Sequence, residues 1–163
     1  GKLYVAHVGD SRCYRFRRGV LEGITEDHSL LNDFRKSLSL TPEEERNFPH
    51  KNIIVRALGM KNTVEVDLQV LDPEKDDMYL LCSDGLTGEI EDDEMQRVLQ
   101  DEKSLIKTCH RLVQMANDSG GRDNITLIVI KVLEDDQEAF TELTDEVTRE
   151  ITEDLSAFSD IED

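Results

Sequence analysis

The sequence has little of several things, and each shortage excludes a class of protein. It has no tryptophan and three cysteines, Cys13, Cys82 and Cys109, among 163 residues. These cysteines are odd in number and form no C-x-x-C pair, so they predict free thiols in a reducing cytoplasm rather than disulfides or a zinc knuckle. No apolar run reaches the roughly 18 residues of a membrane-spanning helix. The first residues lack the basic start, apolar middle and cleavage site of a signal peptide.

Basic residues are also scarce. Lysine and arginine number 19 against 37 acidic residues, which gives a net charge of −18. This balance argues against nucleic-acid binding, which needs clustered positive charge. Residues 134–163 contain thirteen acids and one base. The charge therefore predicts a mixed-charge body over 1–133, followed by an acidic tail over 134–163.

The first part of the body predicts strands and then an insertion. Short apolar or alternating runs at 3–8, 13–18 and 20–25 are separated by glycine turns and predict an antiparallel meander. Residues 26–63 are polar and contain two of the three prolines. Apolar residues from Leu30 to Leu38 recur at near-helical spacing, and Thr41 is placed to cap a second helix. We interpret 26–63 as a flap on the meander.

The second part of the body mixes strands and helices. Residues 63–71 alternate as a strand, and 78–82 predict a strand buried on both sides. Helices are predicted at 91–100 and from Ser104 to the stop at Gly120 and Gly121. Residues 125–133 are nearly all apolar, as expected of a central strand. This order is not an alternating βαβα pattern and favours the α+β class.

Three aspartates stand where a predicted strand stops or starts: Asp10, Asp84 and Asp123. Each has a glycine one or two positions away, and glycine permits tight turns and close approach of another group. Carboxylates that converge repel one another unless protons or cations intervene. Mg²⁺ and Mn²⁺ prefer oxygen ligands and take one or two carboxylates per ion. The pattern therefore predicts a Mg²⁺ or Mn²⁺ site.

Two alternatives compete with this interpretation. An aspartate beside glycine commonly caps a turn by accepting a hydrogen bond from its own backbone, so any one of the three alone favours capping. Cys82 stands two residues before Asp84 and suggests a cysteine nucleophile. However, it lies in a predicted buried strand, and no C-x5-R phosphate loop follows it.

Five motifs together resemble the metal-dependent type 2C protein serine/threonine phosphatases in their bacterial form. They are VGDSR (8–12), TEDHSL (25–30), RALG (56–59), LLCSDGLTG (80–88) and GGRDNITLIVIKV (120–132). The motifs occur in the order that the family has, and the resemblance covers residues 2–132. It implies an α-β-β-α sandwich of two antiparallel sheets flanked by helices, with a metal cleft at one end.

The resemblance also implies roles for individual residues. Asp84 matches a metal-bound aspartate, Asp123 a ligand of one ion of a pair, and Asp10 a ligand of a third, weaker ion. Asn124, Ser83 and Gly85 are expected to support these ligands. Catalysis is then by a metal-activated water, with no side-chain nucleophile.

The family's domain starts before the counterpart of Gly1, and its earlier stretch supplies a phosphate-binding arginine, a bridging aspartate and a histidine suggested as general acid. The chain is therefore expected to be the C-terminal part of the domain, with a half-site that binds metal weakly. His7, His28, His50 and His110 are not expected to replace the missing groups.

The acidic tail carries one apolar stripe at helical spacing: Phe140, Leu143, Val147, Ile151, Leu155 and Phe158. This predicts an amphipathic helix that docks on its own domain or binds a partner. A membrane-surface helix is disfavoured because such helices carry lysine and arginine.

Two functions from different classes remain. The first is hydrolysis of phosphoserine and phosphothreonine in proteins, opposite a serine/threonine kinase in cytoplasmic signal transduction. The second is an incomplete phosphatase-like scaffold that binds a partner through its tail.

Overall fold

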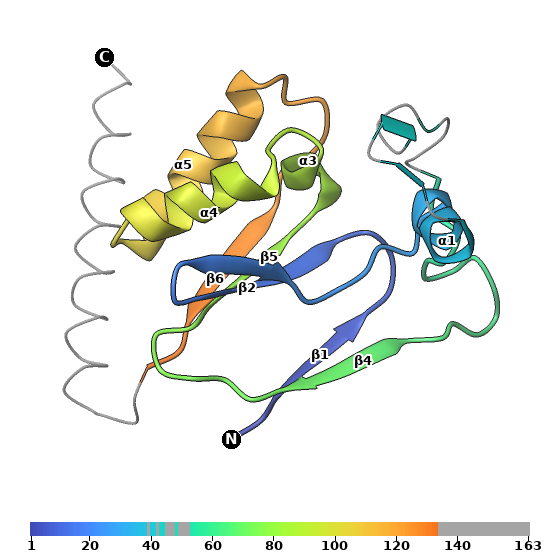
Figure 1. Cartoon of the computed structure of the whole chain (residues 1–163), viewed down its shortest axis with the longest axis horizontal. Helices are drawn as coiled ribbons and strands as arrows, with labels where there is room; N and C mark the ends of the chain where they lie inside the picture. Colours follow the sequence, from blue (N-terminus) through green and yellow to red (C-terminus); the bar gives the residue numbers. More distant parts are fainter. Residues whose placement is uncertain (39, 42, 45–47, 49–52, 134–163) are drawn as a thin grey trace, which may run out of the picture.

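The computed structural model of the chain describes residues 1–38, 40–41, 43–44, 48 and 53–133 (Figure 1). Its elements in chain order are β1 (Leu3–His7), β2 (Arg12–Arg17), β3 (Val20–Gly23), α1 (Leu30–Ser37), β4 (Asp67–Leu71), β5 (Met78–Cys82), α3 (Asp84–Thr87), α4 (Asp92–Asp101), α5 (Leu105–Asp118) and β6 (Leu127–Lys131). The predicted α+β class is confirmed. None of the helices described is long and apolar enough to cross a membrane.

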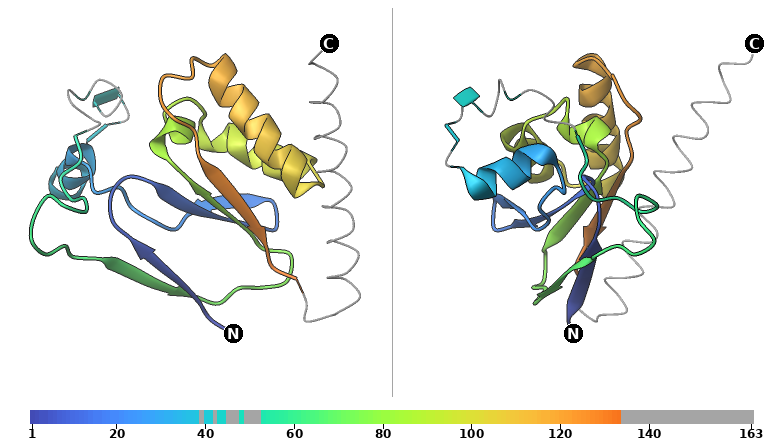
Figure 2. Two further views of the ribbon diagram at one scale, coloured as in Figure 1. Left: turned by 180° about the vertical axis from the view of Figure 1, so that it is seen from behind. Right: turned by 90° about the vertical axis from the view of Figure 1, so that its right-hand side faces the viewer.

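The strands form two antiparallel sheets. The larger has the order β3-β2-β5-β6, and the smaller pairs β1 with β4. Helices α4 and α5 cover one face of the larger sheet, and β1 and β4 lie on its other side (Figures 1 and 2). The described residues therefore supply an α-β-β stack, which is three of the four layers of the expected sandwich.

Alternation along β2 and β5 creates two cores, because successive side chains of a strand point to opposite faces. Tyr14, Phe16, Leu80 and Cys82 belong to the cluster with the helices, and Cys13 and Tyr79 to the cluster between the sheets. The helices contribute their predicted apolar stripes to the first cluster: Met95, Val98, Leu99, Leu112 and Ala116. Each large side chain buried in this way contributes about 1.5–3 kcal/mol, so packing against β2 and β5 is what fixes the helices.

Caps confirm several helix ends that were predicted from sequence. Glu91 and Glu94 form a reciprocal capping box at the start of α4, and Ser104 accepts a hydrogen bond from the N–H of Lys107 at the start of α5. Thr41 and Glu44 exchange hydrogen bonds of 2.8 and 3.3 Å, but most of the helix predicted after Thr41 lies outside the described residues. The tail helix predicted over 134–163 lies outside the described residues.

Three strand predictions were wrong. β1 does not continue a meander with β2; it pairs with β4, with Tyr4 opposite Val70. β6 is an edge strand among the described residues rather than a central one, and Ile128 is 55% exposed. β5 is not buried on both sides along its length, since Leu81 is 37% exposed. Apolar composition alone does not reveal which face of a strand a neighbouring sheet covers.

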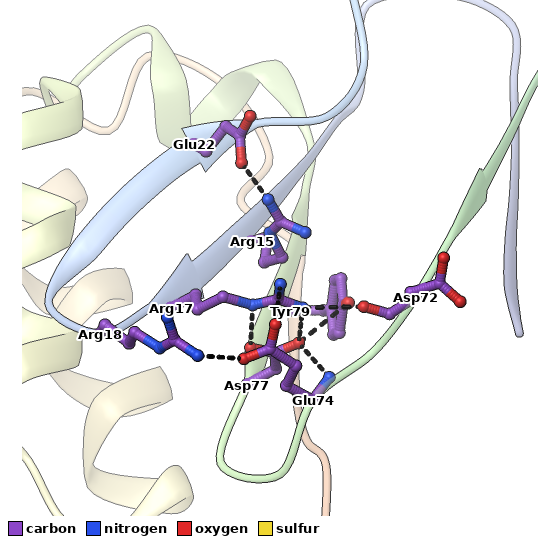
Figure 3. A network of polar contacts seen from close by, with 8 residues as sticks. All are labelled: Arg15, Arg17, Arg18, Glu22, Asp72, Glu74, Asp77 and Tyr79. Carbon is purple, nitrogen blue, oxygen red and sulfur yellow. Dashed lines mark hydrogen bonds and ion pairs between the residues drawn. The ribbon is translucent and has the colours of Figure 1, made fainter. Parts of the chain in front are cut away.

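An ion-pair network fastens the turn before β5 to the end of β2 (Figure 3). The guanidinium of Arg17 donates two hydrogen bonds, of 2.7 and 2.6 Å, to Asp77, whose side chain is 1% exposed. Glu74 accepts from Arg17 and Arg18, each at 2.7 Å. The Arg17 contact lowers the pKa of Asp77, so this carboxylate is charged and structural, and it lies outside the predicted site.

Candidate metal centre

Asp10 lies in the loop that joins β1 to β2, and contacts on both sides fix this loop. Gly9 has a φ of +112°, which residues with a Cβ rarely adopt. Further along, Arg12 donates two hydrogen bonds of 2.8 Å to the carboxylate of Asp27 and one of 3.0 Å to the hydroxyl of Tyr14. The bidentate contact with Asp27 raises the pKa of Arg12. The arginine of the GDSR motif therefore ties this loop to the start of the flap.

Asp84 is the first residue of α3, a four-residue helix that follows β5. The preceding residue, Ser83, bonds to the segment before β6 three times. Its N–H donates to the carbonyl of Thr126 at 2.9 Å, its Oγ donates to the carbonyl of Asn124 at 3.0 Å, and Oγ accepts from the N–H of Thr126 at 3.0 Å. Helix α3 was not predicted from the sequence, because one turn is too short to show an apolar period.

Gly85 allows the backbones of two motifs to touch. A Cβ at this position would lie 2.3 Å from the carbonyl oxygen of Asn124, closer than any side chain tolerates. The absence of a side chain therefore brings the loop of Asp123 and Asn124 directly against the start of α3. This contact is a specific reason for glycine after Asp84.

Asp123 stands in that loop and also serves its own turn. The N–H of Asn124 donates to Oδ1 of Asp123 at 2.7 Å, which is the capping contact that the alternative interpretation predicts. The neighbouring Arg122 donates to Glu89 at 2.7 and 3.2 Å and to the carbonyl of Gly88 at 3.3 Å. This second clamp between the two loops was not predicted from sequence.

Electrostatics link Asp10 to Asp84. Burial, and then the Asp84 carboxylate, raise the pKa of Asp10, so the two acids lie close enough to repel. In the part of the chain that the structure describes, no group of three or more His, Cys, Asp or Glu side chains is placed to hold a metal ion. The fold thus brings Asp10 near Asp84 and puts Asp123 in the adjoining loop, without forming a single cluster of all three.

Cys82 does not have the properties of a nucleophile. Its side chain belongs to the core beneath α4 and α5, and burial raises the pKa of its thiol to about 12. A thiolate is the nucleophilic form, so this cysteine is neutral near pH 7. The cysteines are free, with Cys13 and Cys82 buried, as the sequence predicted.

Comparison with known proteins agrees with this geometry. No family model matches the chain. The chain is 39% identical over 130 residues to the serine/threonine phosphatase stp of Listeria monocytogenes, covering 80% of this chain and 52% of that protein. The solved serine/threonine phosphatase of S. agalactiae matches with a TM-score of 0.75 and 41% identity, over 80% of this chain and 55% of that one. The catalytic domain of the phosphatase PstP, solved with two manganese ions, matches with a TM-score of 0.72 and 35% identity, over 82% and 54%.

Sequence and fold together define the class as a type 2C-like α+β sandwich. The aligned part of the chain is homologous to bacterial serine/threonine phosphatases, which confirms the resemblance seen in the motifs. The chain spans about half the length of the curated relatives that it matches.

Proposed function

We propose that the protein containing this chain hydrolyses phosphoserine and phosphothreonine in other proteins with the help of divalent metal ions. The observation that carries this proposal is the contact of the Asp123–Asn124 loop with Ser83 and Gly85, the two neighbours of Asp84. The relatives compared above are named phosphatases, and the scaffold alternative gains no support from them.

The donor chemistry fits Mg²⁺ or Mn²⁺. Aspartate oxygens are the ligands these ions prefer. Burial, and then the charge of Asp84, raise the pKa of Asp10, and a bound cation would offset both effects. A related structure contains two manganese ions. When bound, such ions supply an activated water and offset charge on the phosphoryl oxygens.

The residues of this chain then have distinct tasks. Asp84 and Asp123 would hold two metal ions, and Asp10 would hold a third, more weakly bound ion. Ser83 and Gly85 position Asp84 through their contacts with the Asn124 segment. Asn124 donates its N–H to Asp123 and so orients that carboxylate.

The wider assignments also belong to the proposal. Residues 1–133 form the C-terminal part of a phosphatase domain, in which the flap over 26–63 borders the substrate. The tail over 134–163 docks on its own domain or on a partner protein. The enzyme acts in the cytoplasm, in signal transduction, on substrates of a serine/threonine kinase.

The test is turnover of p-nitrophenyl phosphate and of a phosphothreonine peptide by the full-length protein in Mn²⁺. Asp84→Asn is expected to lower kcat by roughly 100-fold or more, because an ion loses a charged ligand. Asp93→Asn is the matched control, since the Asp93 side chain is 79% exposed on α4. Turnover that persists in EDTA, or that Asp84→Asn leaves unchanged, contradicts the proposal.

A further inference from the structure

His28 holds the residue before Asp10 from two sides. Its backbone N–H donates to the carbonyl of Gly9 at 2.8 Å, and its ring Nδ1 accepts from the N–H of Gly9 at 3.0 Å. His28 is 5% exposed, so both hydrogen bonds are shielded from water. Both polar groups of Gly9 are therefore bonded to one residue of the flap.

The other ring nitrogen of His28 continues the chain of contacts. Because Nδ1 accepts from Gly9, the neutral ring carries its proton on Nε2. Nε2 lies 3.1 Å from Oδ2 of Asp67 and 3.1 Å from Nη1 of Arg56. As the protonated nitrogen it donates to the carboxylate, because a guanidinium cannot accept. Oδ1 of Asp67 accepts from Nη1 of Arg56 at 2.6 Å. The ring is thereby fixed in one tautomer by a carboxylate that is itself paired.

These contacts join three segments at the end of the sheets. Gly9 follows β1, Asp67 begins β4, and Arg56 lies in the later part of the flap. The backbone adds to the connection, since the N–H of Val55 donates to the carbonyl of His28 at 2.8 Å. A buried histidine of any kind needs partners for both ring nitrogens. What sets His28 apart is that one of these partners is the peptide next to Asp10.

We propose that His28 is a positioning residue of the metal centre, which fixes the Gly9 peptide and so places the Asp10 carboxylate to bind a divalent cation. The inference rests on the proposed function, because it assigns His28 a task only if Asp10 is a ligand. Groups that bond directly to a metal ligand commonly change metal affinity by 10–100-fold. His28 acts one peptide further away, through Gly9, so its effect belongs at the lower end of that range.

Two conservative variants separate the two ends of the ring. In His28→Asn the amide oxygen takes the place of Nδ1 and keeps the bond with Gly9, while the contact with Asp67 is lost. In His28→Gln the amide reaches the place of Nε2 and keeps the contact with Asp67, while Gly9 loses its acceptor. Mn²⁺ alone is the probe, titrated into the full-length protein by calorimetry and by electron paramagnetic resonance, with thermal unfolding recorded for each variant.

We expect His28→Gln to weaken the weakest Mn²⁺ step by roughly tenfold, and His28→Asn to stay within about threefold of wild type. A double-mutant cycle supplies the control: in an Asp10→Asn background, His28→Gln has no further effect on Mn²⁺ affinity. Equal Mn²⁺ affinity in wild type and His28→Gln overturns the inference. The inference is also overturned if both variants lose Mn²⁺ affinity in proportion to their loss of thermal stability, because that result indicates a purely structural role.

The outcomes distinguish this inference from the proposed function. Wild-type protein that binds no Mn²⁺ refutes the metal centre itself, and the role of His28 with it. If neither variant folds, the wild-type protein supplies the deciding measurement. A Mg²⁺ titration by NMR must shift the Gly9 amide and the His28 Nδ1 resonance together with the weakest binding step, and resonances that stay in place to saturation overturn the inference.

Discussion

Gly85→Ala tests whether the close approach of two loops builds the candidate centre. The new Cβ would lie 2.3 Å from the carbonyl oxygen and 2.8 Å from the carbonyl carbon of Asn124, and 3.3 Å from the nitrogen of Ile125. All three are backbone atoms, so no side-chain rotation relieves the overlap. The two segments must move apart by roughly 1 Å to reach ordinary contact distance.

A separation of this size breaks the hydrogen bonds that join the segments. Ser83 Oγ bonds to Asn124 and Thr126 at 3.0 Å each, and an added ångström leaves neither bond intact. Each lost bond costs about 1 kcal/mol, and overpacking adds about 1–3 kcal/mol. We therefore expect Gly85→Ala to lower the free energy of unfolding by about 3–5 kcal/mol and to weaken Mn²⁺ binding, because Asp84 and Asp123 separate.

The assay is urea unfolding followed by circular dichroism, paired with Mn²⁺ titration. Gly23→Ala is the matched control, since the nearest atom to its new Cβ is a Tyr14 ring carbon at 3.9 Å. That variant should change stability by less than about 0.5 kcal/mol. A Gly85→Ala protein with the urea midpoint and Mn²⁺ affinity of wild type would show that this contact does not position the aspartates.

Two further predictions concern groups outside the centre. Asp77→Asn should lower the free energy of unfolding by about 2 kcal/mol at pH 7. This is less than the loss on breaking a fully buried ion pair, because Arg17 keeps its bond to Glu74. Arg17 lowers the pKa of Asp77 in the folded state. The contribution of this ion pair to the free energy of unfolding is therefore complete above the unfolded pKa of about 3.9, and it disappears as the pH falls through the pKa of Asp77 in the folded protein. Urea midpoints from pH 7 to pH 2 should therefore fall more steeply for wild type than for Asp77→Asn, and parallel curves would contradict this. Cys82→Ala should retain the kcat of wild type at matched folded fraction, whereas a loss of 100-fold or more in kcat would restore the cysteine-nucleophile interpretation.

Local features of this protein were predictable from sequence because they depend on residues a few positions apart. The apolar stripes of α4 and α5 and the caps at Glu91 and Ser104 follow from spacings of three and four residues. The motif order predicted the family, and the glycines beside Asp84 and Asp123 indicated close backbone approach. The capping contact at Asp123 shows that the simpler interpretation of an aspartate beside glycine is also correct for that residue.

Tertiary structure alone decided how distant segments pair. β1 joins β4 across about sixty residues rather than β2 across a short turn, and among the strands that the structure describes β6 takes an edge instead of the centre. The composition of the strands does not distinguish these pairings, because an apolar strand can form its backbone hydrogen bonds with a neighbour in either sheet. The packing of the whole core selects the partner. His28 and the Gly85 contact were hidden for the same reason: their partners are close in space and far apart in sequence.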